Sequence, residues 1–177
     1  MLCGDVPGWW REFGRWESGL ARAGKAKVMR KARQVAALAW RLDDQGGLEF
    51  LLVTSRTSKH WLLPKGWPIP GKSGLESALQ EAFEEAGIQA SGPERPIGRY
   101  AFIKVLHDLT ELPCTMAVYA VGGVEELDDW PEKLQRDRMW FKQAEAVSIA
   151  FDFNLSLFLS SVTYDGKRKR LRLGGTK

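Results

Sequence analysis

Apolar residues gather in short runs along the middle of the chain, and turn residues separate these runs. The first two runs are rich in Val, Leu, Ala and Phe, and the segment DDQGG between them is typical of a turn. The runs that predict strands on this basis are 33–42, 48–56, 60–64, 97–106, 113–123 and 139–142. Residues 124–138 are an acidic loop.

Three other segments have the spacing of helices. The best marked runs from 74 to 86, because Ser73 and Glu76 form a capping box at its start and Gly87 can end it. Its apolar arc, Leu75, Leu79, Phe83 and Ala86, is predicted to pack on a sheet. Residues 143–150 and 154–164 are the other helices. Helices and strands mix without regular alternation, which favours an α/β fold with a mixed β-sheet in an α/β/α sandwich.

Composition narrows the class of protein. A chain of 177 residues suits one domain with a full core. No stretch approaches the roughly 20 apolar residues of a membrane helix, and the first residues do not have the pattern of a secretory signal, so we expect no membrane partner. With only two cysteines, Cys3 and Cys114, a disulfide framework is not expected and the cytoplasm is the predicted compartment.

The net charge of +4 is unevenly distributed. Residues 1–34 and 164–177 each carry +5, so the remaining 35–163 carry −6. We therefore predict an N-terminal extension (1–31), a folded domain (32–163) and a frayed basic tail (164–177). Solvated basic ends are commoner than nucleic-acid sites, and no nucleic-acid partner is inferred. Tryptophans in the extension are expected to pack on the body or on a second subunit, which leaves a homodimer open.

Glu81, Glu84 and Glu85 crowd onto one face of the helix 74–86. Like charges at this spacing cost roughly 0.2–0.5 kcal/mol per pair. A solvated acidic face is one interpretation. However, no Lys or Arg on the helix relieves the cluster, and a loop rich in Gly and Pro leads into it. A divalent cation with oxygen ligands would remove the repulsion, and Mg²⁺ typically takes a few carboxylates together with substrate phosphates.

Gly66, the three glutamates and Gly87 also carry a resemblance to a known family. With Ile88 they match the Nudix box, G-x5-E-x7-R-E-U-x-E-E-x-G-U, where U is apolar. The flanking residues resemble the branch that contains the diphosphoinositol polyphosphate and dinucleoside polyphosphate hydrolases, from about residue 33 to about 160. Two positions depart: the first glutamate of the box is Lys72, and its arginine is Gln80. In the family that arginine helps to hold the neighbouring glutamate.

The resemblance implies a Nudix-type sandwich and a pyrophosphohydrolase that cleaves phosphoanhydride bonds of a small polyphosphate. It implies Glu81, Glu84 and Glu85 as catalytic residues and ligands of Mg²⁺ (or Mn²⁺). A second group, implied for substrate binding, is Arg33, Arg56, Lys65 and Gly66.

Weaker candidates and alternatives remain. Lys72 and Lys104 are further cations. Acids of the later loop that could serve as general base are Glu125, Glu126, Asp128 and Asp129. The leading hypothesis is a hydrolase of diphosphoinositol or dinucleoside polyphosphates. One alternative is a different nucleoside diphosphate derivative, such as a nucleotide sugar or a capped RNA end. Another is a ligand-binding domain with little turnover, which the Lys72 and Gln80 departures favour.

Overall fold

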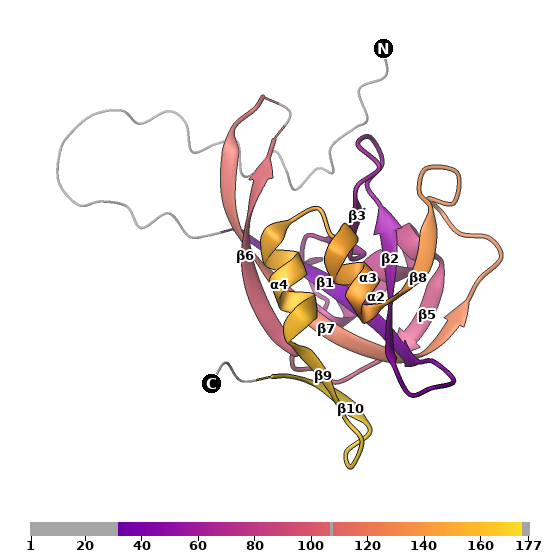
Figure 1. The fold of residues 1–177 in the computed structure, drawn as a ribbon. Helices are drawn as coiled ribbons and strands as arrows, with labels where there is room; N and C mark the ends of the chain where they lie inside the picture. The colour runs from indigo at the N-terminus through magenta and orange to yellow at the C-terminus, as the bar shows by residue number, and fades with distance from the viewer. Residues whose placement is uncertain (1–31, 107, 175–177) are drawn as a thin grey trace. The chain divides into compact units, whose positions relative to one another are not determined.

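The computed structural model describes residues 32–106 and 108–174. The predicted N-terminal extension, with its tryptophans, lies outside these residues. Figure 1 shows the elements in chain order. They are β1 (Ala32–Leu42), β2 (Leu48–Thr54), β3 (Trp61–Leu62), β4 (Lys65–Gly66), α2 (Gly74–Ala86), β5 (Ile88–Ser91), β6 (Gly98–Val105), β7 (Glu111–Glu126), β8 (Arg138–Lys142), α3 (Gln143–Ile149), α4 (Phe153–Ser161), β9 (Val162–Asp165) and β10 (Arg170–Leu173).

One large mixed sheet organises the domain. Its main path is β3-β2-β1-β7-β5, with β4 paired to β1, β6 to β7 and β8 to β2. Strands β1 and β7 are parallel over eight residue pairs, and the other pairs are antiparallel. Strand β1 is central because six successive residues from Gln34 to Ala39 are buried, as expected for a strand covered on both faces. The predicted α/β sandwich with a mixed sheet is confirmed.

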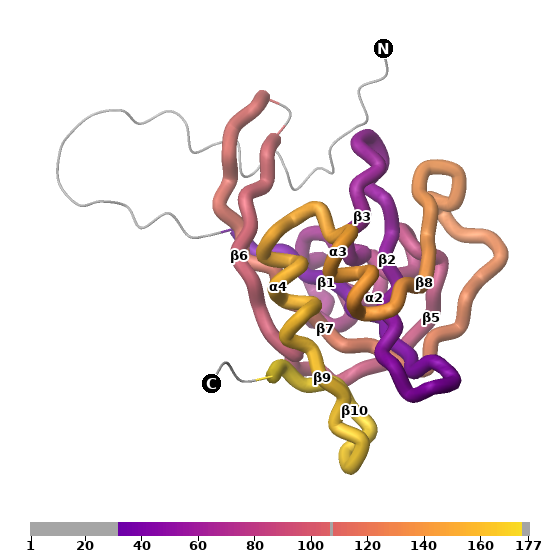
Figure 2. Tube along the Cα trace, viewed as in Figure 1, coloured from indigo at the N-terminus to yellow at the C-terminus, as the bar shows by residue number. Residues whose placement is uncertain are grey.

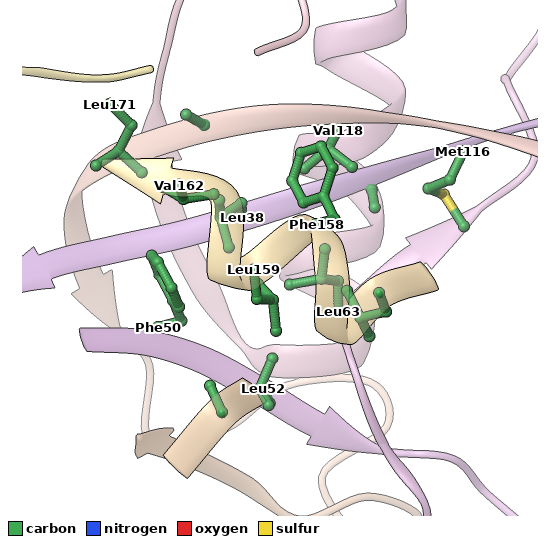
Figure 3. Packing of buried hydrophobic residues seen from close by; sticks show 14 residues of the cluster. Leu38, Phe50, Leu52, Leu63, Met116, Val118, Phe158, Leu159, Val162 and Leu171 are labelled. Carbon is green, nitrogen blue, oxygen red and sulfur yellow. The ribbon is translucent and has the colours of Figure 1, made fainter. Parts of the chain in front are cut away.

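Two hydrophobic clusters lie on opposite faces of this sheet because successive β1 side chains point in opposite directions. Ala36 and Leu38 face the cluster that includes residues of α3 and α4. Val35, Ala37 and Ala39 face the cluster that includes residues of α2. Figure 3 shows the first cluster, in which Phe158 and Leu159 of α4 lie against the strands. Helix α2 and the pair α3–α4 therefore lie on opposite faces of the sheet at β1. In the trace of Figure 2, α3 and α4 lie in front of β1.

The chain end differs from the prediction. Residues 162–173 form an antiparallel hairpin of β9 and β10, so the expectation of a frayed tail is wrong for residues 164–173. Leu171 and Leu173 alternate with arginines, and Leu171 is buried in the α3–α4 cluster. Asp165 accepts hydrogen bonds from the backbone of Lys167 and Arg168, which closes the turn. The helix predicted to reach residue 164 therefore ends at Ser161.

Other boundaries also differ. Strand β5 has no counterpart among the predicted elements, because only Ile88 of its four residues is buried. Strand β7 continues to Glu126, into the segment expected to be an acidic loop. Among the described residues, no helix is long and apolar enough to cross a membrane.

Candidate active site

Helix α2 carries the three clustered carboxylates, and its ends are set locally as the sequence predicts. The Ser73 hydroxyl accepts a hydrogen bond from the Glu76 amide, and the Glu76 carboxylate accepts one from the Ser73 amide. Gly87 ends the helix in the left-handed conformation, with φ of 58°. Capping at both ends fixes where the helix starts and stops, and hence which way its acids point.

The buried face of α2 is rotated from the predicted arc. Leu75 and Ala86 are buried as expected, but Leu79 and Phe83 are only half-buried. Ser77 and Glu85 are buried in its place, and Glu85 is only 5% exposed. The helix therefore presents one of its acids to the protein interior rather than to solvent.

Glu85 lies in a prepared environment. One of its oxygens accepts a hydrogen bond from the Lys65 amide of β4, at 3.0 Å, and the other forms an ion pair with Arg136. Arg136 is itself 8% exposed and donates to the Thr54 carbonyl. Burial raises the pKa of Glu85, while Arg136 and Lys65 oppose that rise. A buried carboxylate is retained in proteins when it is paired and hydrogen-bonded, and Glu85 meets both conditions.

Glu81 lies against the backbone of β4. A Cβ added at Gly66 would overlap its carboxylate, so a larger residue there would displace this carboxylate from its present position. Burial, and after it the charges of Glu85 and Glu84, raise the pKa of Glu81 to about 7. Among the described residues, this carboxylate accepts no hydrogen bond that would offset the crowding. Keeping Glu81 ionised therefore costs the folded protein free energy, which a nearby cation would reduce.

Glu84 accepts a hydrogen bond from a residue of its own helix. The amide nitrogen of Gln80 donates to its carboxylate at 2.6 Å, and the ammonium of Lys72 donates to the Gln80 side-chain oxygen at 2.9 Å. The two residues that depart from the Nudix box therefore contact each other. The backbone carbonyl of Glu84 also accepts a hydrogen bond from the Glu132 amide.

Among the predicted cations, Lys65 and Lys104 interact with the clustered acids, whereas the two arginines are exposed. Burial lowers the pKa of Lys65, and Glu85 and Glu81 are the nearby acids that oppose this change. Lys104 of β6 has its pKa lowered by burial and then by Lys65, and its ammonium lies 4.8 Å from the centre of the Trp67 ring. Arg56 forms an exposed ion pair with Glu132 at 3.7 Å. Arg33 is exposed and, among the described residues, forms no ion pair.

Glu132 and Arg136 are site residues that the sequence interpretation missed. Glu132 pairs with Arg136 and Arg56, and its charge raises the pKa values of Glu81 and Glu85. By contrast, Glu126, one of the acids proposed as a general base, pairs with Arg138 and accepts from Trp140. Glu132 and Arg136 differ from the other charges of the loop only in their contact with α2. This contact joins residues far apart in the sequence, since Arg136 follows Glu85 by 51 residues.

The donor set fits a hard divalent cation. Carboxylate oxygens are the preferred ligands of Mg²⁺, and a cation would relieve the repulsion that, after burial, raises the pKa of Glu81. Within residues 32–106 and 108–174, no three acidic, histidine or cysteine side chains already converge as a closed cage. Glu84 accepts from Gln80 through one of its two oxygens, whereas both oxygens of Glu85 are engaged, by Arg136 and by the Lys65 amide. Completing such a site therefore requires side-chain rotation, water or substrate oxygens.

Comparison with known proteins agrees with this geometry. Residues 32–156 match the family model described as the NUDIX domain. The chain is 34% identical over 111 residues to Nudix hydrolase 12, mitochondrial, of Arabidopsis thaliana, a match covering 61% of this chain and 55% of that protein. It is 28% identical over 120 residues to diphosphoinositol polyphosphate phosphohydrolase 3-alpha of Homo sapiens, covering 66% and 68%.

Solved structures show the same fold. The binary complex of the C. elegans Ap4A hydrolase superposes with a TM-score of 0.52 at 19% identity, covering 73% of this chain and 93% of that one. A NUDIX hydrolase from Nitrosomonas europaea gives 0.57 at 17% identity, covering 80% and 92%. At these identities the likeness concerns the arrangement of helices and sheet.

Proposed function

Because this chain belongs to the Nudix family, we propose that it is a metal-dependent hydrolase of phosphoanhydride bonds in a small polyphosphate substrate. The observation that carries the proposal is the crowding of Glu81, Glu84 and Glu85 on one face of α2. Burial first, and then the charges of the other two acids, raise the pKa of Glu81 to about 7. Among the described residues, Glu85 is the member of this cluster that has an ion-pair partner, and carboxylates gathered with too few cations are typical of a site that a divalent ion completes.

Glu81, Glu84 and Glu85 would hold Mg²⁺ or Mn²⁺. A bound divalent ion would neutralise phosphate charge and lower the pKa of a coordinated water. The protein's part is to keep the carboxylates in place. Gly66 gives Glu81 room, Lys65 and Arg136 orient Glu85, and Gln80 orients Glu84.

Lys65 and Lys104 are the cations best situated for substrate phosphates, since each interacts electrostatically with Glu81 and Glu85. Both are partly desolvated, and a polyanion in this position would favour their charged forms. Arg56 adds an exposed positive charge, which is paired with Glu132. Glu132 is committed to two arginines, and this pairing favours a structural role over that of a general base. Arg33 stays a candidate without a contact to support it.

For the substrate we propose diphosphoinositol polyphosphates or dinucleoside polyphosphates. The human relative is a diphosphoinositol polyphosphate phosphohydrolase and the C. elegans structure is an Ap4A hydrolase, and both names support this class. A second candidate is a ligand-binding domain with little turnover. It is favoured by the Lys72–Gln80 pair and by acids that are not yet arranged as a cage. We propose the cytoplasm as compartment, and a homodimer stays a prediction.

A panel of phosphoanhydrides tests the proposal. Purified protein is incubated with each compound and Mg²⁺, phosphate release is followed, and binding is measured in parallel. We expect release from one class of substrate and a loss of at least about a hundredfold in kcat/KM for Glu85→Gln, by analogy with removal of other electrostatic groups. Arg170→Gln, which removes an exposed charge from β10, is the control. Tight binding without release would favour the second candidate, and equal rates for wild type and Glu85→Gln would refute both.

A further inference from the structure

Gln80 lies between a cation and one of the clustered acids. Lys72 belongs to the loop before α2, while Gln80 and Glu84 lie one turn apart on the helix. The chain of bonds runs from the Lys72 ammonium to the Gln80 oxygen at 2.9 Å, and from the Gln80 nitrogen to the Glu84 carboxylate at 2.6 Å. The ammonium, which can only donate, meets the oxygen of the amide, and the carboxylate, which can only accept, meets its nitrogen.

We propose that Lys72, acting through Gln80, positions the Glu84 carboxylate for a divalent cation without placing a positive charge beside it. This inference rests on the proposed function, because it concerns the metal of the same site. Lys72 and Gln80 are positioning residues here, and Glu84 is the group that would touch the metal.

The chemistry of the three groups sets the direction of the amide. An ammonium has three donors and no acceptor, and an ionised carboxylate only accepts. Gln80 therefore satisfies both neighbours in one orientation, with its oxygen toward Lys72 and its nitrogen toward Glu84. In the reverse orientation, both contacts would be lost. Lys72 thus selects the rotamer in which Gln80 holds Glu84.

Charge explains why a neutral amide suits this position. An arginine at position 80 would bring a cation against Lys72 and, at the same time, neutralise Glu84. A glutamate there would repel Glu84. The neutral amide is oriented by Lys72 and in turn orients Glu84, and it leaves the negative charge of Glu84 free to attract a cation. Because Lys72 itself is exposed, its own charge is screened by water at the distance of Glu84.

The test measures Mn²⁺ affinity, from metal-dependent thermal unfolding and from calorimetric titration, without any substrate. We expect Lys72→Met and Gln80→Met each to weaken Mn²⁺ binding by about five- to tenfold, the effect of one lost orienting hydrogen bond. The double variant should bind no more weakly than Gln80→Met, because Lys72 acts only through Gln80. Lys72→Arg retains a donor and should keep wild-type affinity.

Two controls separate positioning from general effects. Lys142→Met removes the same charge from the end of β8, where Lys142 lies opposite Glu49 in the register with β2, and it should leave Mn²⁺ affinity unchanged. Unfolding of every variant in EDTA should match wild type within a few degrees, because both bonds are at or near the surface.

Unchanged affinity in Lys72→Met, or additive losses in the double variant, would overturn this inference while leaving the metal site intact. Absence of Mn²⁺ binding by the wild-type protein would overturn the inference and the metal site of the proposed function together.

Discussion

Replacing Glu81 by glutamine tests whether the carboxylate cluster is strained before metal binds. Burial and two neighbouring acids move the pKa of Glu81 from its ordinary 4.5 to about 7. A tenfold change in proton affinity corresponds to about 1.4 kcal/mol, so this shift costs the ionised state roughly 3 kcal/mol. Residual solvent access screens part of the cost, and we expect a gain of roughly 1–3 kcal/mol for Glu81→Gln at neutral pH.

The pH dependence follows from the sign of the shift. Because the folded pKa lies above the unfolded value, the folded protein keeps a proton that the unfolded chain has released between pH 4.5 and about 7. This contribution to wild-type stability is therefore complete below pH 4.5, is lost as the pH rises to about 7, and is constant above it. Glu81→Gln has no such loss, so its advantage over wild type should grow through the same interval and then level off.

Urea unfolding in EDTA at a series of pH values measures this difference. Glu76→Gln is the matched control on the same helix, because hydrogen bonds at Ser73 lower the pKa of Glu76 instead of raising it. The difference between that variant and wild type should therefore not change above pH 4.5. In a parallel series without EDTA, saturating Mg²⁺ should reverse the order of stability, because under the proposed function the ion would bind folded wild type through Glu81. An advantage of Glu81→Gln that does not vary with pH would refute the reasoning.

Three further changes test the surroundings of the cluster. Gly66→Ala should abolish stabilisation by Mg²⁺ in thermal unfolding while leaving the far-UV circular dichroism unchanged, because the new methyl group takes the place of the Glu81 carboxylate. Arg136→Met should destabilise the protein by about 3–5 kcal/mol in urea, because Glu85 is left buried without its partner, and adding Glu85→Gln should recover part of the loss. Lys72→Glu combined with Gln80→Arg restores opposite charges at the two positions and should keep kcat/KM within a few fold of wild type. Gln80→Arg alone sets two cations together and should fall below the double variant.

Local signals made α2 predictable. Ser73, Glu76 and Gly87 act within one or two turns, so their pattern in the sequence is also their pattern in space. The three glutamates could be assigned to one helix face for the same reason. The hairpin at the chain end was not predicted, because its arginines give the segment the composition of a solvated tail and the alternation of Leu171 and Leu173 is too short to indicate a strand.

The parts of the site that could not be predicted depend on contacts distant in sequence. Nothing near Glu85 indicates that it is buried, because its partner Arg136 follows 51 residues later. Nor does any motif distinguish Glu132 from the other acids of its segment. The hydrogen bonds that bring residues 127–137 to α2 and β2 decide both questions, among them Glu132 to Glu84 and Thr54 to Asp137.

This attachment of residues 127–137 to α2 has a kinetic consequence. The contact between Arg136 and Glu85 closes a long loop, and closing such a loop costs entropy that local helix formation does not. We expect α2 to form early and the attachment to follow after the main folding barrier. A cation held by Glu85 would then slow unfolding much more than it speeds folding. In stopped-flow experiments the metal should lower the unfolding arm of the chevron and leave the folding arm in place.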